Sequence, residues 1–348
     1  MLRNTLLVLF ITLSITSVLF AQSNCYECHG EMDFTRTNEA GDEESMFVAD
    51  SIFVGSVHGD FDCVDCHADA VGDPHPDELE KVNCGVCHED DHELFQAGLH
   101  GQKLLSGDDC APTCASCHGK HDILSSADEK SRTHSINLVA TCSACHKKDG
   151  PACLDRFGVS QPVERFDDGV HGEALAQGNE EAASCNDCHG SHLLLPRSNP
   201  QSKIFQLNIS STCGECHTDV AEEYNNSSHG KALAAGEFEA PTCINCHGEH
   251  EILSPSDEAS PTHAHNIANQ TCEPCHGSVK LNEKYGLLPD PTRSYENSYH
   301  GLASARGSKV AANCTSCHGV HNIMGVNDPE STIYPANLAE TCGSCHPN

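Results

Sequence analysis

Residues 224–253 read YNNSSHGKALAAGEFEAPTCINCHGEHEIL, and residues 295–324 read YENSYHGLASARGSKVAANCTSCHGVHNIM. Both stretches contain an aromatic residue, a His-Gly pair five residues later, and the motif CxxCH followed by Gly-x-His. A second, plain CxxCH follows each stretch, at Cys272 and at Cys342. Because the same features recur in the same order, the fold is predicted to consist of repeats of this unit.

The motif CxxCH occurs eleven times and accounts for most of the 24 cysteines. It is the attachment motif of c-type haem. Two thiols three residues apart lie on one side of a helical turn and reach the two vinyl groups of one porphyrin, and the following His places its imidazole on the iron. The predicted attachment points are Cys25 and Cys28, Cys63 and Cys66, Cys84 and Cys87, Cys114 and Cys117, Cys142 and Cys145, Cys185 and Cys188, Cys213 and Cys216, Cys243 and Cys246, Cys272 and Cys275, Cys314 and Cys317, and Cys342 and Cys345. The predicted proximal ligands are His29, His67, His88, His118, His146, His189, His217, His247, His276, His318 and His346.

Two other uses of paired cysteines fit the chain less well. Structural zinc sites also contain CxxC pairs, but they have no reason to place His directly after the second Cys. Thioredoxin-like redox pairs predict one motif in a βαβ setting, not eleven in a loop-rich chain. Every CxxC of this chain is followed by His, so the sequence predicts eleven covalently bound haem c groups.

The repeats combine into larger modules. Cys114 and Cys243 are 129 residues apart, as are Cys185 and Cys314. Residues 91–220 and 221–348 are therefore predicted to be two copies of one four-haem module, and residues 22–90 a front region with three haems and one shortened repeat. The five repeats, numbered first to fifth below, begin at the His-Gly pairs of His58, His100, His171, His229 and His300.

The second axial position of each iron is assigned to histidines outside the motifs. The candidates are the His-Gly histidines, those three residues beyond a motif His, and two substitutes in the front region. They are His58, His75, His92, His100, His121, His171, His192, His229, His250, His300 and His321. We expect each repeat to supply both distal ligands for its own two haems. Ala70 stands where the other repeats have a distal His, and His75 is the expected substitute.

This assignment leaves the first haem, at Cys25, without a local partner, and His92 is the nearest remaining candidate. His134, His263 and His265 are the others. His134 and His263 share a repeat position that holds Phe205 and Tyr334 in the other repeats, which favours packing over iron binding. A ligand from a neighbouring subunit or an open, five-coordinate iron are the alternatives.

Two further sets of residues follow the repeat. An aromatic residue stands five positions before every His-Gly histidine, at Phe53, Phe95, Phe166, Tyr224 and Tyr295, and is expected to pack against porphyrin.

Cys110 and Cys153 lie outside the motifs, and neither has a counterpart in the second module. This joint occurrence predicts a disulfide between them, with an extended haem attachment through Cys110 as the alternative.

The composition predicts a mostly irregular fold with short α-helices and little or no sheet. Gly, Pro, Asn, Asp and Ser are dense between the motifs, and only 5% of the residues are aromatic, with no Trp. So few bulky side chains cannot form an ordinary core for 348 residues. The chain is therefore expected to wrap around a row of haems, which act as the core.

The N-terminus and the charge bear on location and partners. An apolar run over residues 6–20 followed by Ala21 predicts a signal peptide over residues 1–21, and the run is short for a membrane span. The mature chain is expected to be secreted, periplasmic or extracellular, with no stable span. A formal charge of −32 excludes a nucleic-acid binder and favours cationic redox partners or extracellular acceptors.

The His-Gly pairs, CxxCHGxH and plain CxxCH motifs resemble those of a broad family of bacterial and archaeal multihaem cytochromes c. The resemblance covers nearly all of residues 25–346. Its members include periplasmic electron carriers and extracellular cytochrome nanowires. The resemblance implies bis-histidine haems of low potential, packed in alternating parallel and perpendicular pairs, and it makes a homopolymer an additional expectation.

Electron transport without catalysis is the function that these observations favour. Two histidine ligands saturate the iron and leave no position for a substrate. A multihaem reductase usually keeps one haem open, often through a variant motif such as CxxCK, and no such variant occurs here. A membrane-anchored quinol dehydrogenase that uses residues 6–20 as its span is a third hypothesis. A soluble carrier and a filament subunit both fit the sequence.

Overall fold

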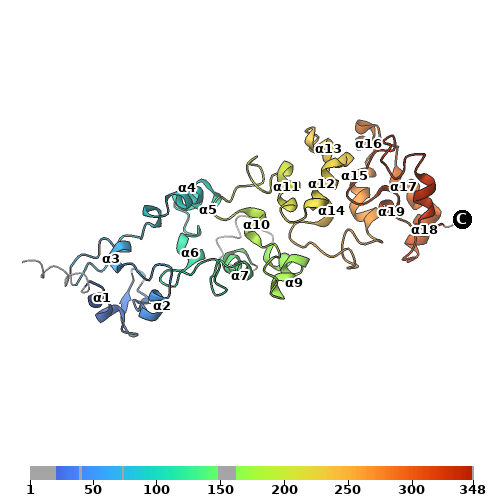
Figure 1. Ribbon diagram of the computed structural model, residues 1–348. Helices are drawn as coiled ribbons and strands as arrows, with labels where there is room; N and C mark the ends of the chain where they lie inside the picture. Colours follow the sequence, from blue (N-terminus) through green and yellow to red (C-terminus); the bar gives the residue numbers. More distant parts are fainter. Residues whose placement is uncertain (1–20, 39–40, 73, 148–161, 347–348) are drawn as a thin grey trace, which may run out of the picture. The chain divides into compact units, whose positions relative to one another are not determined.

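The computed structural model describes residues 21–38, 41–72, 74–147 and 162–346. The chain is mostly irregular and carries many short helices with one two-stranded hairpin, as predicted (Figure 1). None of the helices in these ranges combines the length and apolar character of a membrane span. The apolar run over residues 6–20 lies outside the described residues.

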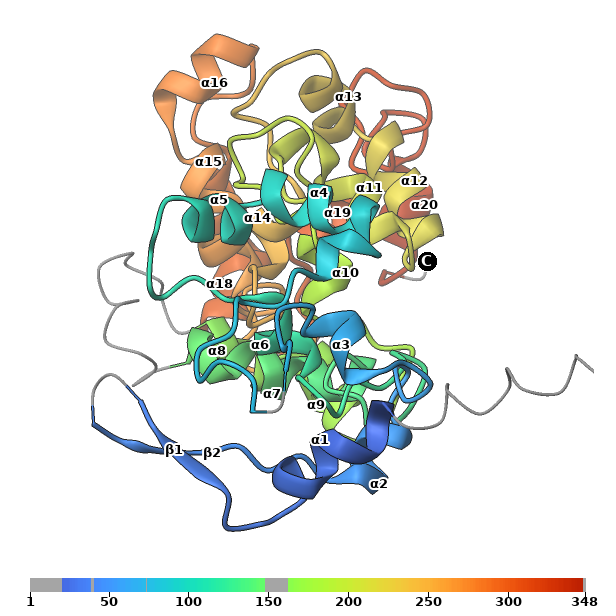
Figure 2. The ribbon, with the colours of Figure 1, turned by 90° about the vertical axis from the view of Figure 1, so that its left-hand side faces the viewer.

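The chain divides into two compact units. The first contains the residues up to Leu94 and Pro112–Asn137, and the second contains Phe95–Ala111 and Leu138–Asn348. The elements before the His-Gly helix of the second repeat are α1 (Ala21–His29), β1 (Thr35–Thr37), β2 (Glu43–Ser45), α2 (Asp50–Val54), α3 (Cys63–Cys66), the 3₁₀ turn η1 (Cys84–Val86) and α4 (Glu89–Ala97), and α4 belongs to that repeat. β1 and β2 pair antiparallel, with Arg36 opposite Glu44, and form a ribbon beside α1 and α2 (Figure 2).

The second to fifth repeats share one order of elements. A short helix that carries the aromatic residue comes first: α4, α8 (Pro162–Asp167), α12 (Thr218–Asn226) or α17 (Pro291–Glu296). The His-Gly helix follows: α5 (Leu99–Leu105), α9 (Val170–Ala176), α13 (Ser228–Ala234) or α18 (Tyr299–Ala305). The first motif forms α6 (Cys114–His118), α10 (Cys185–His189), α14 (Cys243–His247) or α19 (Cys314–His318). The second motif lies in α7 (Ser135–His146), η3 and α11 (Gln206–Asn208, Ile209–Gly214), η4 and α15 (Ile267–Cys272, Glu273–His276) or α20 (Leu338–Gly343). One further helix, α16 (Val279–Tyr285), precedes α17.

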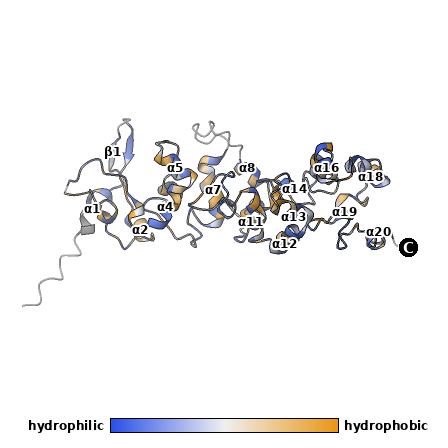
Figure 3. Ribbon diagram, turned by 90° about the horizontal axis from the view of Figure 1, so that it is seen from above, coloured by the Kyte–Doolittle hydropathy of each residue, from blue (hydrophilic) through white to orange (hydrophobic). Residues whose placement is uncertain are grey.

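Hydrophobic side chains do not assemble into a core of ordinary size. Within the described ranges, the buried hydrophobic residues are Val163, Leu175, Ile209, Leu233, Ile267 and Ala268. Figure 3 shows hydrophobic residues in short stretches along the helices, interleaved with hydrophilic ones. These six buried residues supply little of the burial that stabilises a domain, which agrees with a fold that packs around something other than its own side chains.

Each His-Gly helix has a steric reason for its glycine. In the second to fifth repeats, a Cβ on that glycine would collide with the backbone carbonyl of the aromatic residue of the same repeat, as for Gly230 with Tyr224 and Gly301 with Tyr295. The aromatic side chain is anchored as well, since the Tyr224 hydroxyl donates to the Pro241 carbonyl at 2.7 Å. The glycine thus lets the aromatic helix and the His-Gly helix meet closely and sets the direction of the histidine.

Candidate haem-binding sites

The motif of each CxxCHGxH sequence folds as a single helical turn. The residue before the first Cys and the residue before the second Cys cap each other, as Thr242 and Asn245 do in α14. The glycine after the motif His then takes a φ of +81° to +91° and ends the turn. A side-chain residue is strained at such φ values. The two thiols and the imidazole are thereby held on one short, rigid element. None of the 22 motif cysteines forms a disulfide, and each is at least partly exposed, so they are accessible for attachment.

Histidine rings meet in pairs at the spacing that one iron requires. A metal–imidazole bond is about 2 Å long and the ring centre lies roughly 1 Å behind its nitrogen, so two imidazoles on opposite sides of one metal have centres about 6 Å apart. In every repeat, the His-Gly histidine lies at this distance from the second motif His of its own repeat. These pairs are His58–His88 (6.0 Å), His100–His146 (6.0 Å), His171–His217 (6.2 Å), His229–His276 (6.1 Å) and His300–His346 (6.0 Å).

The first motif His pairs across repeats, not within one. Its partner ring comes from the CHGxH loop of the following repeat. These pairs are His67–His121 (6.2 Å), His189–His250 (6.0 Å) and His247–His321 (6.1 Å). Our expectation that each repeat serves both of its own haems therefore differs from the structure. His118 belongs to the first compact unit and His192 to the second.

The front region also differs from the sequence-based assignment. The ring of His75 lies 5.8 Å from that of His29, so His75 stands opposite the first motif and not opposite the second or third. Nδ1 of His29 forms a 2.9 Å hydrogen bond with the carbonyl oxygen of Met46, which fixes the ring and directs its other nitrogen to the His75 side. His92, the sequence-based candidate, is not needed as a partner for His29.

A repeated backbone contact explains the pairing across repeats. The residue before the His-Gly histidine donates its N–H to the carbonyl two residues beyond the distal His of the next repeat, with an N···O distance of 2.8 Å each time. These docking contacts are Val57 to Ile123, Leu99 to Leu194, Val170 to Ile252, and Ser228 to Ile323. The CHGxH loop of one repeat is thus fastened to the His-Gly helix of the repeat before it, and its histidine enters the site of that earlier repeat.

Burial favours the neutral form of both rings in four of the histidine pairs. It lowers the pKa of both rings in four pairs: His67 with His121, His100 with His146, His189 with His250, and His229 with His276. The effect is largest at His229, whose pKa falls to about 4. A neutral imidazole presents the lone pair that a metal needs. These residues therefore fit the axial positions of haem iron.

Motifs that are consecutive in the sequence are neighbours within each compact unit. At one kind of junction the first cysteines of two motifs are hydrogen-bonding neighbours: Cys25–Cys63, Cys84–Cys114, Cys142–Cys185, Cys213–Cys243 and Cys272–Cys314. At the other kind of junction, the second cysteine of one motif interacts electrostatically with a cysteine of the next motif. These pairs are Cys66 with Cys84, Cys188 with Cys213, Cys246 with Cys275, and Cys317 with Cys342. Within each compact unit the two kinds of junction alternate.

The other predicted residues are placed as follows. The ring of His263 lies 5.3 Å from that of His265, and His134 is buried. Phe53 meets the edge of His121 with a ring-centre distance of 6.4 Å. Cys110 is disulfide-bonded, while Cys153, its predicted partner, lies outside the described residues.

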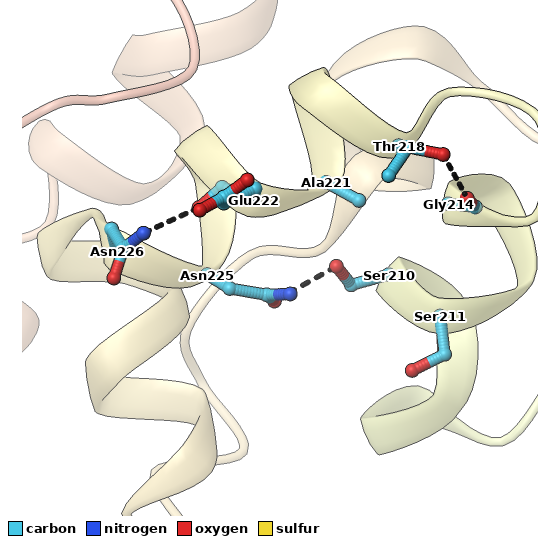
Figure 4. Close-up of a pocket in the computed structure, with 8 residues that line it drawn as sticks. All are labelled: Ser210, Ser211, Gly214, Thr218, Ala221, Glu222, Asn225 and Asn226. Atoms are coloured by element: carbon cyan, nitrogen blue, oxygen red, sulfur yellow. Dashed lines mark hydrogen bonds between the residues drawn. The ribbon is translucent and has the colours of Figure 1, made fainter.

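A pocket of about 310 Å³ lies between α11 and α12, beside the motif at Cys213 (Figure 4). Its lining is mostly small and polar, and the Ser210 hydroxyl donates to the Asn225 amide oxygen at 2.8 Å across it. No candidate iron ligand lines this pocket, so it is separate from the histidine pairs.

No protein-family model matches the chain, and neither the curated proteins nor the solved structures contain a match to it.

Proposed function

We propose that this chain is an undecahaem c-type cytochrome that carries electrons along a row of bis-histidine haems, in the periplasm or outside the cell. The observation that carries the proposal is the pairing of nine motif histidines with a second histidine ring at 5.8–6.2 Å. Each pair contains a motif histidine, so the two thiols of a CxxC motif that forms no disulfide lie beside it. Zinc sites or surface histidines would have no reason to repeat this spacing.

The proposal assigns a separate role to each class of residue. Motif cysteines hold the porphyrin, motif histidines bind the iron from one side, and the His-Gly and CHGxH histidines bind it from the other. When bound, haem supplies a one-electron couple between ferric and ferrous iron. Two nitrogen ligands keep the coordination the same in both oxidation states, so little rearrangement accompanies each transfer.

The order of the thiol contacts supports transport along each compact unit. Consecutive motifs lie next to each other, so an electron moves between neighbours in sequence order. The two alternating kinds of junction agree with the alternating haem geometry that the resemblance to multihaem cytochromes implies. Redox partner proteins or extracellular acceptors would exchange electrons with exposed haem edges, and cationic partners would be attracted by the acidic chain.

The haem count tests this function directly. Intact mass spectrometry of matured protein should give the mass of the cleaved chain plus eleven haems. The double variant Cys243→Ser, Cys246→Ser should carry ten, because one attachment site is removed. Ten or fewer haems in the matured wild-type protein would contradict the assignment of at least one motif, and zinc in place of haem would contradict the function as a whole.

A multihaem reductase is the second candidate, and one observation favours it. His318 has no second histidine ring opposite it in the described part of the chain, and an iron with one open position could bind substrate. Turnover of nitrite or hydroxylamine by the purified protein, lost in His318→Ala, would support this function. Absence of turnover together with eleven low-spin haems would favour the carrier.

A further inference from the structure

The docking contacts share one acceptor position, the carbonyl two residues beyond a distal histidine. In the CHGxH loops, a backbone N–H of the preceding repeat donates to this carbonyl. His75 lies outside any CHGxH loop, yet the carbonyl two residues beyond it, that of Asp77, is also held. It accepts a hydrogen bond from Nη1 of Arg36 at 3.1 Å. The acceptor position is therefore the same, whereas the donor is a side chain.

The cross-strand neighbour of Arg36 directs this side chain. Arg36 lies in β1 opposite Glu44 in β2. Its Nε and Nη2 both donate to Oε2 of Glu44, at 3.1 and 3.0 Å. A guanidinium group is rigid and planar, so fixing two of its nitrogens also sets the direction of the third. The ion pair with Glu44 thus turns Nη1 towards the segment that carries His75.

The same ribbon also contacts the opposite member of the pair, His29. Met46 directly follows β2, and its carbonyl oxygen forms the 2.9 Å hydrogen bond with Nδ1 of His29. The Val48 N–H donates to the His29 carbonyl at 2.7 Å. The ribbon of β1 and β2, beside α1 in Figure 2, therefore fixes His29 through its backbone and reaches the His75 segment through Arg36. The two rings it links are almost parallel, with 6° between their planes.

The other contacts of the His75 segment are local. Nδ1 of His75 forms a 2.8 Å hydrogen bond with the Pro76 carbonyl oxygen, which orients the ring and leaves its other nitrogen for a metal. The Glu80 N–H donates to the Asp69 carboxylate and joins two ends of the segment. These bonds shape the segment, and the Arg36 contact attaches it to the ribbon.

We infer that Arg36 is the positioning residue for the distal ligand of the first haem. Its guanidinium group holds the His75 segment as the backbone docking contact holds each CHGxH loop. The inference rests on the proposed function, because it needs haem at Cys25 and Cys28. The Arg36 and Glu44 side chains are 41% and 45% exposed, so water competes for them and the contact is weaker than a buried one. Unlike a backbone contact, it can be removed by one substitution.

The experiment measures carbon monoxide binding to full-length, matured and reduced proteins, always as a difference from wild type. In Arg36→Ala, His75 should leave the iron more often, so the carbon monoxide affinity of one haem should rise roughly tenfold, as expected for the loss of one charge-assisted hydrogen bond. Glu44→Ala should raise the affinity of the same haem by a smaller factor, because Nη1 is then no longer directed. In the background Cys25→Ser, Cys28→Ser both increases should vanish.

A double substitution shows whether Arg36 acts through His75. His75→Ala should add one open iron per chain. Arg36→Ala combined with His75→Ala should bind carbon monoxide as His75→Ala does, because no ligand remains for Arg36 to position. Thr37→Ala is the matched control, since Thr37 is an exposed neighbour on β1 whose side chain points to the other face of the ribbon. It should behave as wild type.

Three results would overturn the inference: wild-type affinity in Arg36→Ala, an increase that persists without the first haem, or an equal increase in Thr37→Ala. If Arg36→Ala matures with fewer than eleven haems, Glu44→Ala takes its place, and wild-type affinity in that variant overturns the inference too. A mass below eleven haems in the wild-type protein would instead contradict the proposed function, whatever the variants do.

Discussion

His250→Met should raise the potential of the haem attached at Cys185, not of the haem attached at Cys243 beside it in the sequence. The ring of His250 lies 6.0 Å from that of His189, so the substitution converts the site of the third repeat to His/Met. Axial ligands shift haem potentials over about 0.8 V, and we expect a rise of roughly 0.1–0.3 V in one of eleven haems. A spectroelectrochemical titration would resolve this single displaced component.

Two attachment variants identify the haem that responds. In the background Cys185→Ser, Cys188→Ser the displaced component should vanish, because the haem that His250 serves is absent. In the background Cys243→Ser, Cys246→Ser it should remain. The reverse result would restore the simpler arrangement in which each repeat serves its own haems, and it would contradict the pairing across repeats.

Val170→Pro should weaken the docking of the fourth repeat on the third, because it removes one hydrogen bond between them. Val170 is the first residue of α9, a position where helices accept proline, and Gly169 before it has extended backbone with ψ 163°. The lost bond is the 2.8 Å docking contact to the Ile252 carbonyl. Leaving that carbonyl unpaired should cost about 1–3 kcal/mol. Denaturant titrations that follow the low-spin haem signal should show an earlier transition.

Tyr299→Pro is the matched control for this change. Tyr299 is the first residue of α18, and Ser298 before it has extended backbone with ψ 165°. Within the described chain its N–H makes no docking contact. In dilute, monomeric protein this variant should unfold with the wild-type midpoint. Equal destabilisation by both substitutions would mean that proline itself disturbs the helix and that the docking contact contributes nothing.

The motif and its repeat were sufficient to predict the class of fold. Dense turn residues and few aromatics predicted short helices with little sheet, and the structure has one two-stranded hairpin. Most of the histidines that meet in pairs were on the predicted list, because the His-Gly and CHGxH positions recur in register, whereas none of the nine pairs contains the predicted ligand His92. The role of the His-Gly glycine was not, since its clash with the Tyr224 carbonyl depends on how two helices approach.

Which two histidines pair with each other could not be predicted from their order along the chain. Sequence distance favours the pairing of His250 with His247, three residues away, yet a single turn ended by Gly248 at φ +86° directs the two rings to different sites. In the front region, Ala70 indicated a lost ligand and His75 its substitute, but the position of His75 opposite His29 depends on tertiary contacts such as the 2.9 Å hydrogen bond that orients His29. Both are tertiary effects that leave no periodic signal.

The docking of each CHGxH loop on the preceding repeat has a consequence for how the protein is made. In the proposed cytochrome, the first motif histidine of each repeat would lack its partner until the CHGxH loop of the next repeat has docked. A gene lengthened by whole repeats would encode a chain whose added repeats dock through the same backbone contact, so a change of length leaves the packing between repeats intact.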